Sequence, residues 1–293
     1  QETEGKMITI DNVSKSLGKF QLQNISFELP GGYICGLAGR NGAGKTTLLH
    51  LLLGLYRADE GRLTVSGMTY EQSEQAIHDM IGTVLVEELF EPFYSIKSNA
   101  GHFGKYFSGY RWDRMAAYLE RFGLDAHRRF GKLSRGEKLK CQFAFALAHD
   151  PKLLLLDEPA GNFDPDFREQ FFQIIKDFIA DETKSVILAT HQTDDLDRLA
   201  DYLICLEDGR QIFAGDMESF RSAYRVVSGE RYKINLLPQE RIIHVQEKRY
   251  GTKALVRHSR LNRYDASLQV TYPTIEEFMY FYSSGKAAQE RRK

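Results

Sequence analysis

The sequence of 293 residues has few cysteines and no long apolar run. Its three cysteines, Cys35, Cys141 and Cys205, lie far apart in apolar surroundings. They form no disulfide or metal framework, so we interpret them as small buried hydrophobic residues of a reducing compartment. No apolar stretch approaches the ~20 residues that a membrane helix needs. The first four residues, QETE, are polar and acidic, which is not the start expected of a secretory signal.

The chain as a whole also lacks an excess of charge of one sign, because its formal net charge is −1. Charged residues make up 27% and hydrophobic residues 42% of the sequence, which is typical of a soluble globular protein with room for two domains. The charge is unevenly distributed, since residues 218–293 carry 15 Lys and Arg against 8 Asp and Glu. This basic region could face anionic lipid, an acidic protein surface or nucleic acid, or be a solvated face.

A glycine-rich turn, GRNGAGKT at residues 39–46, follows an apolar segment at 33–38 and precedes an apolar helical segment at 47–53. It fits the pattern G-x-x-x-x-G-K-[ST], in which glycines let backbone N–H groups point inward and the helix N-terminus adds positive charge. Lys45 would supply a charge for the β- and γ-phosphates, and the Thr46 hydroxyl would bind Mg²⁺. The alternative is a glycine-rich turn that binds nothing. The residues expected to hold nucleotide phosphate are Asn41, Gly42, Ala43, Gly44, Lys45, Thr46 and Thr47.

Two carboxylates, Asp157 and Glu158, end the apolar segment at 153–156. An aspartate at the tip of a buried parallel strand would lie beside the glycine-rich turn and could hold Mg²⁺. The glutamate after it could polarise an attacking water. The alternative, a strand that merely ends in a polar turn, is disfavoured by the glycine-rich turn.

Apolar periodicity predicts the elements around these motifs. Apolar segments at 152–157 and 185–190, separated by a helix at 166–180, predict a parallel sheet buried on both faces. Further strands are predicted at 7–10, 20–22, 25–29, 62–65 and 82–86, and helical spacing at 96–131 and 137–149. Short strands at 232–236, 241–246, 253–256 and 267–270 and a helix at 275–282, with Thr274 as its N-cap, predict a small C-terminal unit.

A further motif, LSRGE at 133–137, opens a predicted helix, with Ser134 as N-cap and Glu137 completing a capping box. The segments PAGNFDP at 159–165 and LATHQTDDLDRLAD at 188–201 follow it. With the glycine-rich turn and Asp157-Glu158, these segments resemble the signature motif, D-loop and H-loop of ATP-binding cassette (ABC) ATPases, in the family's order. The resemblance covers about residues 7–216.

The resemblance implies an α/β P-loop NTPase with an antiparallel β subdomain, a helical subdomain and a small C-terminal α+β extension. Its domains would be the cassette at 7–216, with the helical subdomain at about 96–150, and the accessory domain at 220–285. The resemblance also implies that two cassettes meet head to tail around two ATP molecules. In that arrangement Lys45 would bind phosphate, Thr46 and Asp157 would bind Mg²⁺, and Glu158 would polarise water. His191 would contact the γ-phosphate. Ser134 and Gly136 would contact the nucleotide bound to the partner, and Asp164 would couple the two sites.

Three positions depart from the family's pattern. Leu17 occupies the place of the adenine-stacking aromatic, so we expect Phe20 to take over the stacking. The Q-loop glutamine aligns with Val86, followed by Glu87 and Glu88; Glu87 is our candidate metal contact, and the sequence does not rank it against Glu88. In the signature, Arg135 and Glu137 replace the commoner Gly and Gln.

The chain has one cassette and no coiled coil, and its aromatic segment FGKYFSGYRWDRMAAYLERFGL resembles exporter ATPases that have separate membrane subunits. We therefore predict an ATP-hydrolysing exporter subunit, peripheral at the cytoplasmic face of the cell membrane. Its partners would be integral permease subunits and a second cassette, in a homodimer rather than a heterodimer, with no nucleic acid. The alternative is a soluble or mechanotransmitting ABC ATPase that drives no transport, whose basic region could bind nucleic acid. A P-loop GTPase is disfavoured because no Asn-Lys-x-Asp motif is present.

Overall fold

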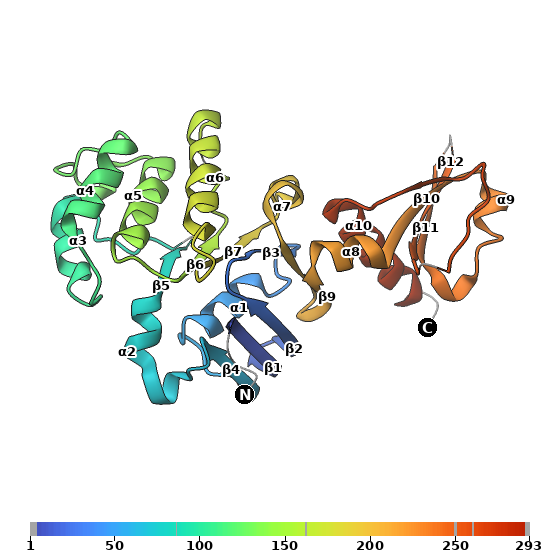
Figure 1. The fold of residues 1–293 in the computed structure, drawn as a ribbon, viewed down its shortest axis with the longest axis horizontal. Coiled ribbons are helices and arrows are strands. Elements are labelled where there is room, and N and C mark those ends of the chain that lie inside the picture. The colour runs from blue at the N-terminus through green and yellow to red at the C-terminus, as the bar shows by residue number, and fades with distance from the viewer. Residues whose placement is uncertain (1–4, 86, 162, 249–250, 260, 291–293) are drawn as a thin grey trace.

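The computed structural model describes residues 5–85, 87–161, 163–248, 251–259 and 261–290. A nine-stranded sheet forms the centre of the molecule, a group of helices lies at one end, and the C-terminal unit lies at the other end (Figure 1). The strand order of the large sheet is β4-β1-β2-β9-β8-β3-β7-β6-β5. Its strands are β1 (Lys6–Leu17), β2 (Phe20–Pro30), β3 (Ile34–Gly39), β4 (Glu60–Val65), β5 (Ile81–Val84), β6 (Leu153–Asp157), β7 (Ser185–Thr190), β8 (Tyr202–Glu207) and β9 (Arg210–Asp216).

The three strands β3, β6 and β7 are buried at every residue, which confirms the parallel sheet covered on both faces. Strand β7 pairs in parallel with β3 on one side and with β6 on the other. The carboxyl ends of parallel strands meet at one edge of a sheet. Gly39, Asp157 and Thr190, the last residues of these three strands, therefore lie at the same edge, which we call the catalytic edge.

The antiparallel part of the sheet contains the segments predicted at 7–10, 20–22 and 25–29, which lie within the longer strands β1 and β2. Strand β1 also pairs with β4. Asn12 has a φ of 50° beside a register shift, a left-handed conformation that asparagine tolerates better than most residues. This irregular pairing lets β1 run past the end of the predicted segment.

The helices that precede the C-terminal unit include a group within residues 96–150, as the helical spacing predicts. An aromatic cluster fixes part of this group, since Phe90 contacts both Phe130 and Phe145 at ring-centroid distances of 5.3 and 5.1 Å. Helices α2 and α7 were not predicted. The helices of this part are α1 (Lys45–Leu52), α2 (Tyr70–Met80), α3 (Ile96–Gly104), α4 (Trp112–Arg121), α5 (Arg135–Ala148), α6 (Pro165–Ile179) and α7 (Thr193–Leu199), with a 3₁₀ turn, η1 (Phe130–Lys132), before α5.

The C-terminal unit, residues 217–290, contains a four-stranded antiparallel sheet in the order β11-β12-β10-β13. Three of the four predicted strands overlap β11, β12 and β13, and Glu277 N–H donates to the Thr274 hydroxyl at 3.1 Å, as the predicted N-cap requires. Its elements are α8 (Met217–Ala223), β10 (Tyr224–Gly229), α9 (Arg231–Ile234), η2 (Gln239–Arg241), β11 (Ile242–Lys248), β12 (Gly251–Arg257), β13 (Gln269–Thr271) and α10 (Ile275–Glu290).

The strand predicted at 232–236 is wrong, because the segment forms helix α9 and a following turn. The Glu230 carbonyl accepts hydrogen bonds from the N–H groups of Lys233 and Ile234, which closes one helical turn. Only Ile234 of this turn is fully buried, while Tyr232 and Leu236 are exposed. The place beside β12 is taken instead by β10, which the apolar pattern did not indicate.

The three cysteines are free, buried thiols, in agreement with their interpretation as small hydrophobic residues. Burial raises the pKa of all three, so each is held as the neutral thiol. Within the described ranges, no helix combines the length and apolarity that crossing a bilayer requires.

Candidate functional site

The glycine-rich turn joins β3 to α1 at the catalytic edge. Gly42 and Gly44 have φ angles of 80° and 109°, and Gly44 is the N-cap of α1. A Cβ at Gly44 would lie 2.9 Å from Leu22 and 3.0 Å from Phe20, so this position requires glycine for both its conformation and its contacts. The turn thus directs the N-terminus of α1 toward an open cavity, which is the geometry of a phosphate cradle.

This cavity has a volume of about 460 Å³ and brings together most of the predicted nucleotide-binding residues. Phe20 and Leu17 both line it, so an aromatic ring is present although the family's usual position carries leucine. The cavity is lined by Leu17, Phe20, Arg40, Asn41, Gly42, Gly44, Lys45, Thr46, Thr47, Asp157 and Glu158. Of the predicted phosphate-binding residues, Ala43 is not among its lining side chains; it is buried in the core beneath the turn.

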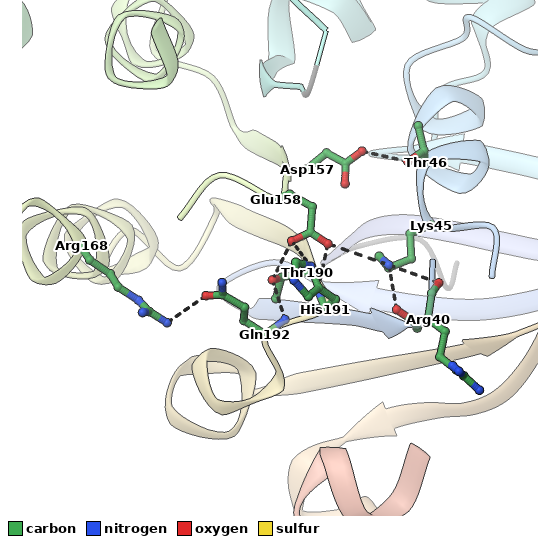
Figure 2. Close-up of polar contacts among 10 residues, drawn as sticks. Arg40, Lys45, Thr46, Asp157, Glu158, Arg168, Thr190, His191 and Gln192 are labelled. Atoms are coloured by element: carbon green, nitrogen blue, oxygen red, sulfur yellow. Dashed lines mark hydrogen bonds and ion pairs between the residues drawn. The ribbon is translucent and has the colours of Figure 1, made fainter. Parts of the chain in front are cut away.

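Lys45 is buried and reaches back along the turn. Its Nζ donates to the Gly39 carbonyl at 2.7 Å and lies 4.0 Å from Glu158 Oε1 (Figure 2). Burial lowers the pKa of Lys45, and the nearby charges of Glu158 and Asp157 act in the opposite direction. The same Nζ also makes a longer hydrogen bond, 3.5 Å, to the Arg40 carbonyl. An ammonium group that is dehydrated and held by two carbonyls and a distant carboxylate is well placed to pair with an incoming anion.

Thr46 and Asp157 meet across the start of α1 and the end of β6. The Thr46 hydroxyl donates to Asp157 Oδ2 at 2.9 Å. Burial raises the pKa of Asp157, while the Thr46 hydrogen bond favours its ionised form. The predicted pair of Mg²⁺ ligands is therefore assembled by the fold. Hydroxyl and carboxylate oxygens are the donor types that Mg²⁺ prefers, so these residues fit that ion.

The two neighbouring acids of the Q-loop segment differ in their contacts. Glu88 forms an ion pair with Lys138 of α5, with 2.5 Å between Oε1 and Nζ. The charge of Glu87 acts instead on Asp157 and contributes to the rise in its pKa. Glu87 is thus the acid whose charge reaches the candidate metal ligands. Val86 lies outside the described residues.

Glu158 is held in one orientation by residues at the end of β7. Its carboxylate accepts hydrogen bonds from the Thr190 hydroxyl at 3.0 Å and the His191 N–H at 2.9 Å, and His191 Nδ1 lies 2.8 Å from Oε2 (Figure 2). The Glu158 N–H donates to the Ala189 carbonyl at 2.8 Å, and its φ is 48°. A non-glycine residue in this left-handed region is uncommon and is maintained here by the surrounding contacts.

A second layer of polar contacts lies behind Glu158. The Thr190 hydroxyl also accepts the Gln192 N–H at 3.0 Å, and the Gln192 side-chain oxygen accepts from Arg168 at 3.2 Å. Arg168, on α6, also donates to the buried Asp195 of α7 at 2.5 Å. Sequence reasoning missed Thr190, Gln192, Arg168 and Asp195. The only signal in the sequence was the polar Thr-His-Gln run at the end of an apolar strand.

The signature residues lie elsewhere, at the N-terminus of α5. The Ser134 hydroxyl accepts from Glu137 N–H at 3.2 Å, and Glu137 accepts from Ser134 N–H at 2.7 Å, which confirms the capping box. Arg128 adds an ion pair to Glu137 at 2.5 Å, and this contact, together with the hydrogen bond from the Ser134 N–H, lowers the pKa of the Glu137 carboxyl. Neither Ser134 nor Gly136 lines the nucleotide cavity of its own chain.

Asp164 lies between the two groups, as the N-cap of α6. Its carboxylate accepts from the Phe167 N–H at 2.9 Å and from Lys140 of α5 at 3.2 Å. The segment before α6 is thereby tied to the helix that carries the signature. Asn162, within the predicted D-loop, lies outside the described residues.

A buried lysine in a glycine-rich strand-to-helix turn, facing a hydroxyl–carboxylate pair on a neighbouring parallel strand, defines a P-loop nucleoside triphosphatase. Comparison with known proteins narrows this class. The family model described as ABC transporter matches residues 22–161. The chain is 33% identical over 217 residues to Nod factor export ATP-binding protein I of Burkholderia lata, covering 71% of this chain and 70% of that protein. It is 31% identical over 206 residues to YdbJ of Bacillus subtilis, an uncharacterized ABC transporter ATP-binding protein, covering 69% and 67%.

The chain therefore belongs to the family of ABC transporter ATP-binding proteins and is an ATP-binding subunit and ATPase of that family. Solved structures share its fold. An ATP-binding subunit of an ABC transporter superimposes with a TM-score of 0.69 at 19% identity, covering 73% of this chain and 92% of that one. A dimeric ATP-binding cassette in a post-hydrolysis state, bound to ADP and Pi, gives 0.64 at 23% identity, covering 72% and 99%.

Proposed function

We propose that this chain hydrolyses Mg²⁺-ATP as one of two cassettes of an exporter whose membrane subunits are separate chains. The observation that carries the catalytic part is the convergence of Lys45, Thr46, Asp157 and Glu158 on one cavity at the catalytic edge. The observation that favours export is the likeness to relatives named as export ATP-binding proteins, which extends over 71% of this chain. In this proposal the chain is peripheral, at the cytoplasmic face of the membrane.

Phosphate binding falls to the turn and to Lys45. The backbone N–H groups of the glycine-rich turn and the positive end of α1 would face the phosphates. The Lys45 ammonium, held by the Gly39 carbonyl in this structure, would transfer its hydrogen bonds to the β- and γ-phosphate oxygens. Because burial has already dehydrated this ammonium, its attraction to the phosphates is stronger than that of a surface lysine. Phe20 would stack against the adenine.

The Mg²⁺ ion would be held by Thr46 and Asp157, with Glu87 as a further carboxylate near them. Among the described residues, no group of three or more His, Cys, Asp or Glu side chains could hold a metal ion unaided, so phosphate oxygens and water must complete the site. When bound, the ion would neutralise negative charge on the phosphates during phosphoryl transfer.

Glu158 would act as the residue that orients and polarises the attacking water. The Thr190 hydroxyl, the His191 N–H and the His191 Nδ1 atom hold its carboxylate in place. This arrangement limits the rotamers available to the glutamate, so that less freedom is lost when the water is bound. His191, whose side chain is largely exposed, would turn from Glu158 to the γ-phosphate when ATP is present.

In the proposed mechanism, the nucleotide cavity of one chain is completed by residues of a second chain. Ser134 and Gly136 are absent from their own chain's nucleotide cavity, yet Ser134 caps a 14-residue helix whose N-terminus is open to an anion. We propose that this helix end faces the γ-phosphate bound to a second copy, in a head-to-tail homodimer, where its dipole stabilises negative charge. Asp164, which bonds to both α5 and α6, would couple the two sites. The dimeric cassette that shares this fold supports the arrangement.

A loop beside the catalytic edge offers a surface for a membrane subunit. The buried Asn99 fixes this loop, because its side chain accepts from Glu91 N–H at 2.8 Å and donates to the Glu91 carbonyl at 3.0 Å. Phe90 is buried in the aromatic cluster, whereas Phe93 and Tyr94 are 80% and 60% exposed. A rigid loop that presents two aromatic rings to solvent is typical of a docking site. We call residues 90–94 the docking loop.

Co-isolation tests this proposal. The full chain, expressed with the genes beside its own and purified from membranes in detergent, should bring with it a hydrophobic membrane protein. Phe93→Ala with Tyr94→Ala should abolish that co-isolation, because the two rings supply the exposed apolar area of the docking loop. Tyr272→Ala, which removes an equally exposed ring (60%) from the C-terminal unit, is the matched control and should retain the partner. Repeated purification of the parent chain alone would contradict the transport function.

A further inference from the structure

A groove of about 520 Å³ separates the catalytic edge from helix α10 of the C-terminal unit. The family motifs do not account for it, and it brings helix α10 close to His191. One wall carries Arg40, His191 and Thr193. The other wall carries Glu276, Tyr280 and Ser284 of α10.

The α10 wall is fixed relative to the histidine. Asp197 of α7 accepts the Ile275 N–H, the first of α10, at 3.2 Å, and α7 begins two residues after His191. Burial raises the pKa of Asp197, and this hydrogen bond opposes the shift. Two turns further along, the Ser283 hydroxyl donates to Glu207 at 2.8 Å. Helix α10 is thereby held at the H-loop helix and at the end of β8.

Apolar packing reinforces these polar contacts. Phe278 lies 5.1 Å from Phe220 and 4.8 Å from Tyr224, measured between ring centroids, and it belongs to the same core as the helical subdomain. The buried rings join the C-terminal unit to the rest of the chain through one hydrophobic core. The α10 wall of the groove is therefore a fixed part of the surface beside the nucleotide cavity.

The groove adjoins the nucleotide cavity. Arg40 lines both of them, and Tyr280 is 49% exposed at the opposite wall. Glu276 makes no hydrogen bond or ion pair with any other residue in the described part of the chain, and neither does the Arg40 guanidinium. Because Arg40, His191, Glu276 and Tyr280 line one groove, a macromolecule that covers Arg40 and His191 would come close to α10.

We propose that α10 is part of the surface that receives a second copy of this chain. The inference rests on the proposed function, in which the second copy covers the P-loop and His191. The approaching copy brings its signature segment, residues 132–140, which carries four basic residues and one acid, Glu137. Lys138 and Lys140 pair with Glu88 and Asp164 of their own chain, so Lys132 and Arg135 are the basic residues of this segment that an acid of the other copy would meet. Glu276, which forms no ion pair within the ranges that the structure describes, has the complementary charge, and the half-exposed Tyr280 offers a large ring for burial. The C-terminal unit thus enlarges the ATP-dependent interface.

Photo-crosslinking tests the contact directly in the full chain. In a Glu158→Gln background, which should retain bound ATP, p-benzoylphenylalanine replaces Tyr280 and conserves an aromatic side chain at the site. Irradiation with Mg²⁺-ATP should give a covalent two-chain product, and irradiation without nucleotide should give almost none. The same crosslinker at Tyr232, which is 58% exposed in the C-terminal unit but outside the groove, is the control and should give no two-chain product. Mixing isotope-labelled and unlabelled chains identifies the second copy by mass spectrometry.

Charge reversal gives a quantitative version of the test. Glu276→Arg should weaken the ATP-bound dimer of the Glu158→Gln chain by about tenfold in dissociation constant, because it places like charges opposite each other. Glu240→Arg, an exposed charge reversal outside the groove, should leave the dimer unchanged. Sedimentation velocity measures both.

The outcomes separate the two hypotheses. A Glu158→Gln chain that stays monomeric in saturating ATP would overturn the proposed two-copy mechanism itself. A normal ATP-dependent dimer with no crosslink at position 280, or with a crosslink that forms equally well without ATP, would overturn only the role of α10. A dimer of Glu276→Arg as tight as its parent would do the same.

Discussion

The catalytic edge and the signature end of α5 are built in opposite ways. At the catalytic edge the polar groups bond across long sequence separations, as in the Thr46–Asp157 hydrogen bond over 111 residues and the Thr190–Glu158 hydrogen bond over 32. At the signature end, the contacts of Ser134, Glu137 and Arg128 all lie within nine residues. One site is assembled by the sheet, and the other by a single helix start.

This difference shows that a single chain can assemble the nucleotide-binding part of the proposed two-chain site by itself. The register of β3, β6 and β7 sets the distances between Lys45, Asp157 and Glu158, so the nucleotide half exists before a partner arrives. The signature helix satisfies its own donors locally and keeps its positive end free for an external anion. Substitutions at the catalytic edge should therefore affect chemistry within each chain, whereas substitutions at the signature should affect the association of two chains.

The largest effect should come from Lys45→Ala. Loss of the buried ammonium removes a preorganised charge from the phosphates, and removal of one such donor typically costs about 10²–10³ in turnover. Steady-state phosphate release measures the effect. Lys15→Ala, which removes a surface ion pair with Asp59, is the control and should keep parent activity. Parent-like turnover in Lys45→Ala would mean that the cavity at the catalytic edge is not the ATPase site.

A smaller effect is expected at Thr190, which orients Glu158 without touching the nucleotide. Thr190→Val keeps the shape but removes a hydrogen bond to a charged group, worth about 1.5 kcal/mol, and should lower kcat about tenfold with little change in KM. Thr190→Ser retains the hydroxyl and should restore most of the rate. Equal losses in the two variants, or a change confined to KM, would show that the hydroxyl does not position the carboxylate.

The smallest effect on a single chain should come from Ser134→Ala. Loss of an N-cap costs about 1 kcal/mol in the free energy of unfolding. Ser95→Ala is the matched control, because Ser95 caps α3 in the same helical group by accepting from Ser98 N–H at 3.1 Å. Denaturant unfolding should show similar losses in both variants.

The two caps should differ in a second measurement. Only Ser134→Ala should weaken the ATP-dependent dimer of the Glu158→Gln chain, because only α5 is proposed to face a phosphate of the other copy. Sedimentation in saturating ATP distinguishes them. Equal dimer affinities in Ser134→Ala and Ser95→Ala would show that Ser134 acts only as a helix cap.

The same contrast explains what the sequence could predict. The strands β3, β6 and β7 were predictable because each is a continuous apolar segment, and the P-loop and capping box because their residues are adjacent in sequence. Helix α2 was missed because Ile77 is its only buried residue, which leaves no apolar period to detect. Thr190 and Arg168 were missed because their partners are determined by strand register and helix packing, which no local pattern encodes.

The C-terminal unit was the hardest part to predict for a related reason. Strand β10 has only two fully buried residues, Val226 and Val227, and its strand neighbours β12 and β13 come later in the chain. The segment around Ile234 has an apolar spacing that suits a strand or one helical turn equally well. Packing against β10 and β12 decides between them, and that packing forms only when the sheet is complete.

The docking loop separates the residues that hold it from the residues that it displays. Asn99 and Phe90 fix the backbone from inside, with help from the Tyr94 carbonyl, which accepts from Phe130 N–H at 2.9 Å, while the rings of Phe93 and Tyr94 are exposed. We expect substitutions of these two rings to leave folding and ATP turnover unchanged, so in the proposed function selection on them acts through the membrane partner. After gene duplication, a copy of this ATPase could bind a different membrane subunit through a few substitutions in the docking loop, without any change in its nucleotide site.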